Sequence, residues 1–157
     1  MLAKLQKLFS NPKRGAAHLE LGAKGEQAAL EYLKEIEGFE IVATNYRVPL
    51  GRNLRNQKIT GEIDIIAYDE ETLVFIEVKT RTSDEFAAPE RAVDLRKQRQ
   101  IARAARKYRQ FMKVTNEPHR YDVVTVVTQS GGNKIELLRF YFDDSVFSRG
   151  RYFNRDS

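Results

Sequence analysis

The chain has 157 residues, of which 41% are hydrophobic and 31% charged, and its isoelectric point is about 9.5. This length favours one domain with an ordinary core, and the absence of a long apolar run predicts a cytoplasmic protein with no membrane span. The lack of cysteine excludes disulfides, thiolate zinc sites and thiol catalysis. Only two histidines are present, His18 and His119. Neither lies in a hydrolase motif, so chemistry must come mainly from carboxylates, lysine and arginine.

The N-terminal part predicts a helix followed by a strand. Residues 1–18 resemble a basic leader, interrupted at Asn11-Pro12. Apolar residues at spacings of three and four predict a helix over about 19–37, which Gly38 would end. A strand is expected over 39–48, followed by a polar, basic loop over 49–60.

The remaining pattern completes an α/β fold with the order α-β-β-β-α-β-β. The expected elements are strands over 62–68 and 72–80, a helix over about 90–113, and strands over 121–128 and 134–142. A helix between the third and fourth strands permits a crossover, which predicts a central mixed β-sheet flanked by helices. We expect the domain to span residues 19–142, with a charged, frayed tail over 143–157.

The hairpin formed by the second and third strands carries the candidate chemistry. If its turn is centred between Glu70 and Glu71, Asp64 faces Glu77 and Glu62 faces Lys79. Opposed carboxylates on a buried strand pair either take up a proton or gain a cation.

Hard oxygen ligands suit Mg²⁺ or Mn²⁺, and Lys79 beside them could stabilise an attacking water or a phosphate. The alternative is a solvated strand end with a Glu62–Lys79 ion pair, which would contribute little. The hydrophobicity of both strands favours a central hairpin instead.

Two further features bear on this site. Glu26 projects near the apolar face of the first helix, beside Gly22 and Gly25, which would allow close approach to the sheet. It is either a boundary residue that reaches solvent or a further contributor to the metal site. Asp122, close to Arg120, is expected to be an arginine-paired structural carboxylate.

The second helix is strongly basic, with nine basic residues and one acid between Arg91 and Lys113. Such a face suits phosphate neutralisation, although an ordinary solvated helix face is the alternative. The residues predicted to contact nucleic acid are Arg47, Arg81, Arg96, Lys97, Arg99 and Arg103.

Five segments together resemble the bacterial YraN/UPF0102 family. They are ATNYR (43–47), GEIDIIAYD (61–69), VFIEVKTR (74–81), AVDLRKQRQI (92–101) and RYDVV (120–124). That family is similar to the PD-(D/E)xK, restriction-endonuclease-like nucleases, near the Holliday-junction resolvases. Relative to the family pattern, residues 48–60 look like an insertion.

The resemblance implies a restriction-endonuclease-like fold and metal-dependent hydrolysis of DNA, with branched DNA among the candidate substrates. Asp64, Glu77 and Lys79 occupy the positions of the family's catalytic motif, and Glu26 that of the acidic residue of the first helix. Asp64, Glu77 and Glu26 would bind Mg²⁺ or Mn²⁺, and a homodimer is allowed by analogy. A non-cleaving nucleic-acid-binding module and an accessory or scaffold protein are the alternatives.

Overall fold

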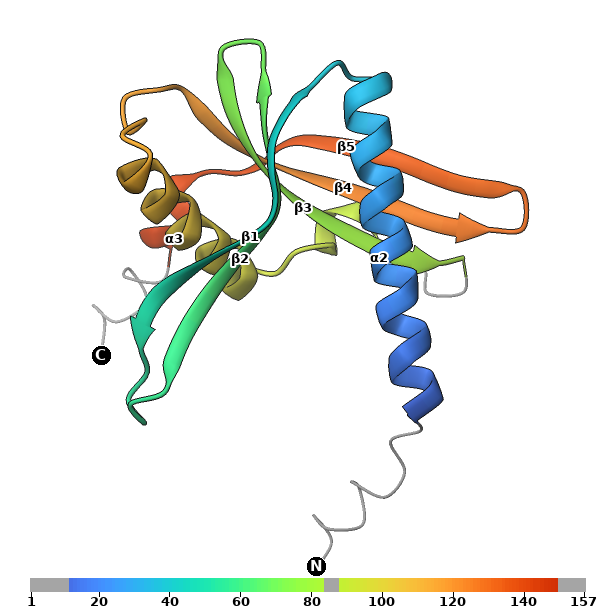
Figure 1. The fold of residues 1–157 in the computed structure, drawn as a ribbon, viewed down its shortest axis with the longest axis horizontal. Helices are drawn as coiled ribbons and strands as arrows, with labels where there is room; N and C mark the ends of the chain where they lie inside the picture. Colours follow the sequence, from blue (N-terminus) through green and yellow to red (C-terminus); the bar gives the residue numbers. More distant parts are fainter. Residues whose placement is uncertain (1–11, 84–87, 150–157) are drawn as a thin grey trace, which may run out of the picture.

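The computed structural model describes residues 12–83 and 88–149 (Figure 1). Its elements are α2 (Pro12–Glu35), β1 (Glu40–Arg52), β2 (Lys58–Asp69), β3 (Thr72–Thr82), the 3₁₀ turn η2 (Pro89–Arg91), α3 (Leu95–Phe111), β4 (His119–Gln129), β5 (Gly132–Phe142) and η3 (Asp144–Phe147). The predicted order of helices and strands is confirmed. Within the described ranges, no helix has the length and apolar character required to cross a membrane.

The five strands form one mixed sheet in the order β1-β2-β3-β4-β5. β3 and β4 are parallel, whereas the other three neighbouring pairs are antiparallel. Parallel neighbours cannot be joined by a tight turn, and α3 lies in the connection that joins them. The predicted α/β fold with a central mixed sheet is therefore confirmed.

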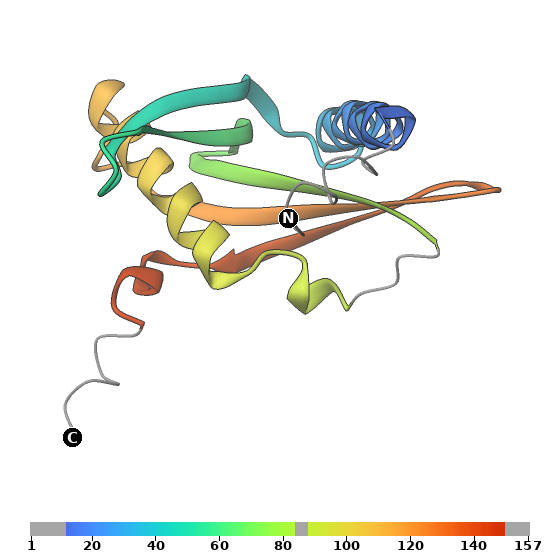
Figure 2. The same ribbon diagram turned by 90° about the horizontal axis from the view of Figure 1, so that it is seen from below.

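Each face of the sheet is covered by one helix, as Figure 2 shows. Leu33 of α2 packs with Ile65 and Ile76 in one buried cluster. On the opposite face, Ile101 of α3 packs with Phe75 in a second cluster. The sheet is thus buried on both sides around β2 and β3, as their hydrophobicity predicts.

The β2–β3 hairpin has the predicted register only near its turn. Pairing runs from Asp69–Thr72 to Ile65–Ile76 and ends there. Beyond this point β2 continues to pair with β1, and β3 with β4. The two strands therefore diverge, and we call the gap that opens beyond the Ile65–Ile76 pair the fork.

Two boundaries differ from the sequence-based expectation. Helix α2 begins at Pro12, within the expected leader, because proline suits the first turn of a helix. The loop predicted over 49–60 is wrong: β1 continues to Arg52 and β2 begins at Lys58. Polar strands extend here as a hairpin, and the Asn53 side chain accepts backbone hydrogen bonds inside its short turn.

The segment after β5 is also more ordered than the expected frayed tail. η3 inserts Val146 into the α3-side core, where it is fully buried. Residues 1–11 of the expected leader and 150–157 of the expected tail lie outside the described residues.

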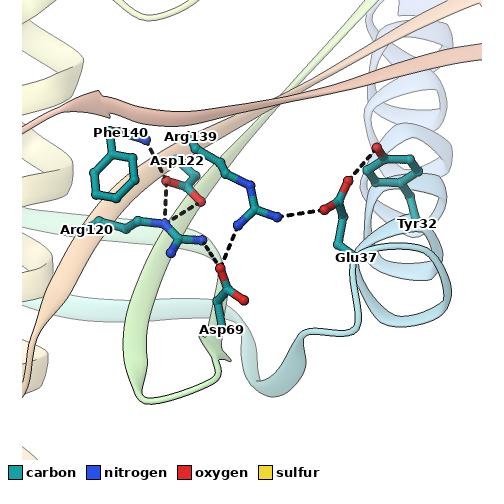
Figure 3. Close-up of polar contacts among 7 residues, drawn as sticks. All are labelled: Tyr32, Glu37, Asp69, Arg120, Asp122, Arg139 and Phe140. Carbon is teal, nitrogen blue, oxygen red and sulfur yellow. Dashed lines mark hydrogen bonds and ion pairs between the residues drawn. The ribbon is translucent and has the colours of Figure 1, made fainter.

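A network of ion pairs closes the hairpin end of the sheet, at the opposite end from the fork (Figure 3). Arg120 Nε donates to both carboxylate oxygens of Asp122 at 3.1 and 3.0 Å, and Arg120 also reaches Asp69 at 2.7 Å. Arg139 then bridges Asp69 and Glu37 at 2.6 and 2.7 Å. The predicted pairing of Asp122 with an arginine is confirmed, and the network connects the end of α2 to β2, β4 and β5.

Helix α2 approaches β3 most closely at Gly25. A Cβ atom placed there would lie 1.8 Å from Thr80 Oγ1 and 2.7 Å from Thr80 Cβ, whereas one at Gly22 would meet nothing within 4 Å. The predicted close approach to the sheet is therefore present at Gly25 and absent at Gly22 in the described structure. Gly25 thereby sets the position of its neighbour Glu26.

We expect Gly25→Ala to lower the free energy of unfolding by roughly 1–3 kcal/mol, because the added methyl group must push the helix and sheet apart. Gly22→Ala is the matched control, since it adds the same group in open space of the same helix. It should stabilise the protein by up to about 1 kcal/mol through helix propensity. Urea titration of both variants measures the difference, and equal effects would contradict the close packing at Gly25.

Candidate functional site

The fork is stabilised by a side chain that replaces part of the strand ladder. The Val78 backbone N–H donates to Asp64 Oδ2 at 2.8 Å. Since pairing between β2 and β3 ends at Ile65 and Ile76, the carboxylate satisfies an amide that would otherwise lose its partner. Asp64 is therefore held in the gap between two strands.

Glu77 lies beside Asp64 and is 4% exposed. Its Oε1 atom is 3.5 Å from Lys79 Nζ and 3.4 Å from Lys97 Nζ. Its Oε2 atom is buried and finds no hydrogen-bond partner among the residues that the structure describes. A buried carboxylate oxygen without a partner is unusual and calls for an explanation, such as an ion or a proton.

The pKa shifts of the two carboxyl groups also indicate a site that takes up a cation or a proton. Burial raises the pKa of Glu77 to about 7, and the nearby Asp64 adds to the rise, although Lys97 and Lys79 oppose it. Burial also raises the pKa of Asp64, against the Val78 hydrogen bond, Lys97 and a hydrogen bond that the protonated Glu77 carboxyl group donates. Two lysines do not compensate fully for the removal of these carboxylates from water.

Glu26 lies across a neighbouring cleft of about 230 Å³, which Asp64, Thr44 and Asn45 also line. Burial raises the pKa of Glu26, and Asp64 and Glu62 raise it further, while a hydrogen bond with Asn45 lowers it. Glu26 is therefore near Asp64. Nevertheless, the described part of the chain contains no group of three acidic or histidine side chains placed to hold one ion.

The structure thus brings together Asp64, Glu77 and Lys79 and leaves Glu26 at the edge of the site. The two carboxylates fit a divalent cation for two reasons. Glu77 Oε2 is buried without a partner among the described residues, and the pKa values of both acids are raised, so a bound cation would stabilise their ionised forms. Mg²⁺ is often bound by one or two carboxylates, with waters and substrate phosphates as the other ligands. Asp64 and Glu77 would hold the ion, and Glu26 as a third ligand stays a prediction.

The predicted opposition of Glu62 and Lys79 is wrong, because the strands diverge before reaching it. Glu62 pairs instead with Arg47 of β1 at 3.2 Å, and Lys79 pairs with Glu77 of its own strand. The alternative of a simple solvated Glu62–Lys79 ion pair is therefore also absent from the described structure.

The basic residues predicted to contact nucleic acid have different surroundings. Lys97 reaches into the site itself, whereas Arg96 and Arg103 are exposed on α3. Arg99 Nε donates to the Val146 carbonyl at 2.8 Å, so this side chain anchors η3. Arg81 lines a small pocket of about 100 Å³ together with Lys79.

Sequence reasoning missed the contribution of β1 to the cleft. Asn45 has a φ of 49° within the continuous strand β1, and Thr44 and Asn45 line the cleft together with Glu26. Asparagine tolerates this left-handed conformation better than most residues. The signal was present in the ATNYR segment, but nothing in it specifies on which side of the strand the asparagine lies.

Comparison with known proteins places the chain in a family. The profile of "Uncharacterised protein family UPF0102" matches residues 25–126. A UPF0102 protein of Desulfosudis oleivorans is 42% identical over 127 residues, which cover 81% of this chain and 93% of that protein. Another, of Bacteroides thetaiotaomicron, is 39% identical over 132 residues, covering 84% of this chain and 99% of the relative.

Among solved structures, SSO0001 superposes with a TM-score of 0.38 and 18% identity, covering 82% of this chain and 55% of that one. The profile match includes Asp64, Glu77 and Lys79 of the fork. The chain therefore belongs to the UPF0102 family.

Proposed function

We propose that this protein is a cytoplasmic, metal-dependent endonuclease that hydrolyses phosphodiester bonds of DNA. The observation that carries the proposal is the pair of buried carboxylates at the fork, Asp64 and Glu77, with Lys79 and Lys97 close to Glu77. Carboxylates can bind a metal ion, and a lysine beside them can stabilise negative charge on a phosphate that the same ion contacts.

Each residue at the fork has a distinct role in this proposal. Asp64 and Glu77 hold the cation, which when bound would polarise the phosphate and lower the pKa of a coordinated water. Lys79, whose side chain is 34% exposed, orients the attacking water or stabilises charge that develops on the phosphate. Lys97 is a positioning residue, because its ammonium group lies 3.4 Å from Glu77 Oε1 and holds that carboxylate in place.

A purely structural role for the fork is disfavoured by comparison with the ion-pair network at the other end of the sheet (Figure 3). There Asp122 is fully buried as well, but it accepts hydrogen bonds from Arg120 and from the Phe140 N–H. A structural carboxylate in this protein is thus well paired, whereas Glu77 Oε2 has no such partner in the described residues.

A second candidate is a nucleic-acid-binding module that keeps the fold but does not cut. It is favoured by one specific observation: the described residues do not gather a third metal-binding side chain around Asp64 and Glu77. Such a protein would retain the basic surface of α3 and bind DNA without turnover.

The decisive assay incubates the protein with branched, linear and single-stranded DNA and Mn²⁺. We expect cleavage of at least one substrate, reduced roughly 100-fold or more in Asp64→Asn and Lys79→Ala, because each loses an interaction needed in the transition state. DNA binding in EDTA should survive in both variants. Glu20→Gln is the control, since Glu20 is an exposed acid that pairs only with Lys24 on α2 in the described structure.

Equal cleavage by the wild type and Asp64→Asn would exclude the proposed site. Binding of all three substrates without cleavage would instead support the second candidate, the non-cleaving nucleic-acid-binding module.

The raised pKa of Glu77 predicts a pH dependence of stability in the absence of metal. The ordinary pKa of a glutamate is 4.5, whereas the pKa of Glu77 in the folded protein is about 7, so the folded state binds an extra proton between these values. The free energy of unfolding should therefore fall as pH rises from about 4.5 to 7, by roughly 1–3 kcal/mol. Denaturant titrations in EDTA at pH 5 and pH 8 measure the change.

Glu77→Gln should reduce this fall, because glutamine cannot ionise. Mn²⁺ at pH 8 should restore the stability of the wild type but not raise that of Glu77→Gln. The Glu20→Gln control should behave like the wild type. A wild-type profile identical to that of Glu77→Gln would show that Glu77 does not titrate as described.

A further inference from the structure

A groove of about 600 Å³ lies between β1 and the C-terminal half of α3. β1 contributes Tyr46, Arg47 and Pro49 to its lining, and α3 contributes Lys107 and Phe111. The groove is distinct from the fork, and the roles proposed above leave its aromatic residues unexplained.

The groove presents aromatic side chains to solvent. Phe111, the last residue of α3, is 78% exposed, although most large apolar side chains of this domain are buried. The Tyr46 ring is partly buried and is held edge-on against Tyr108, with ring centroids 5.0 Å apart and planes at 89°. Tyr46 and Phe111 line the same groove and so offer aromatic surface on which a flat ring can stack.

The charge around these rings is positive. Arg47 and Lys107 are exposed, and none of the described residues that line the groove is acidic. Positive side chains around aromatic faces match a single-stranded nucleic acid, whose bases stack while its phosphates meet the cations. An apolar peptide without acidic residues would fit this groove less well than a nucleic acid, because it would leave the positive side chains unpaired.

The groove and the cleft beside Asp64 share the edge strand β1. Thr44 and Asn45 of β1 line the cleft beside Asp64, and the next residues, Tyr46 and Arg47, line the groove. Arg47 also contacts Glu62 at 3.2 Å, and Glu62 lies near enough to Asp64 to affect its pKa. The cleft lies on the α2 face of the sheet and the groove on the α3 face, and β1, which is an edge strand, separates them. A nucleic-acid strand that occupies both must therefore pass around the edge of the sheet at β1.

We propose that this groove binds an unpaired segment of the substrate, with bases stacked on Phe111 and Tyr46 and phosphates beside Arg47 and Lys107. The inference rests on the proposed function and narrows it, because it identifies the substrate as DNA that carries a single-stranded segment. A fully paired duplex has no base available to stack in the groove.

The test measures binding by fluorescence anisotropy in EDTA, so that cleavage cannot interfere. The probes are a labelled single-stranded DNA, the RNA of the same sequence and the corresponding DNA duplex. Phe111→Ala should weaken single-strand binding roughly 5- to 150-fold, since stacking contributes about 1–3 kcal/mol per base, and should change duplex binding little. Leu19→Ala is the matched control, because Leu19 is also 78% exposed on a helix but lies outside the groove.

Salt dependence separates stacking from charge. Lys107→Ala should reduce the slope of log K against log salt by about 0.7 for a single strand, whereas Phe111→Ala should leave the slope unchanged. A 2-aminopurine base in the probe should be quenched by the wild type and less by Phe111→Ala.

Wild-type affinity in Phe111→Ala, or an equal loss in Leu19→Ala, would overturn the inference. A loss confined to RNA would overturn its assignment to DNA, and a dimer that Phe111→Ala dissociates would assign the groove to a second copy of the chain. Because these measurements need no metal, they are independent of whether Asp64→Asn abolishes cleavage. Cleavage that depends on Asp64 together with normal binding by Phe111→Ala would reject the groove alone.

Discussion

The hydrogen bond from the Val78 N–H to the Asp64 carboxylate is the interaction on which the candidate site depends. It satisfies a backbone donor where β2 and β3 cease to pair, so the two strands can diverge without leaving that buried amide unpaired. The same hydrogen bond holds Asp64 beside Glu77 and at the edge of the cleft that contains Glu26. A local departure from regular sheet structure thereby collects acidic groups from α2, β2 and β3.

The rest of the fold restrains this open end from a distance. A network of ion pairs near the hairpin turn links β2 and β4 to β5 and to the end of α2 (Figure 3). Its members are Glu37, Asp69, Arg120, Asp122 and Arg139. Burial raises the pKa of Asp122 in the network as it does for the acids of the fork, but Asp122 is paired with Arg120, whereas Glu77 Oε2 has no partner among the described residues. This contrast within one sheet is the physical reason to regard the fork as a site of chemistry and the network as a support, since buried charges that serve stability are normally paired.

The sequence predicted the parts of the structure that follow from local pattern. Alternation and the acidic turn gave the correct hairpin register as far as Ile65 and Ile76, and the spacing of apolar residues gave both helices. It could not predict the divergence of the strands, which depends on a side chain replacing a carbonyl. For the same reason, the predicted Glu62–Lys79 pairing failed. The contact of Lys97 with Glu77 was not predicted, because Lys97 was expected only to contact nucleic acid. The strands within residues 49–60 could not be predicted, because their side chains are polar and show no alternation of apolar and polar residues.

The central claim is that Asp64 and Glu77 form a cation site, and direct titration with Mn²⁺ tests it without any substrate. Electron paramagnetic resonance at pH 7.5 counts the free ion as protein is added. The account predicts one bound Mn²⁺ per chain in the wild type, loss of that binding in Asp64→Asn, and its retention in Lys79→Met, which removes a positive charge beside Glu77. Equal binding by the wild type and Asp64→Asn, or no binding by either, would contradict it.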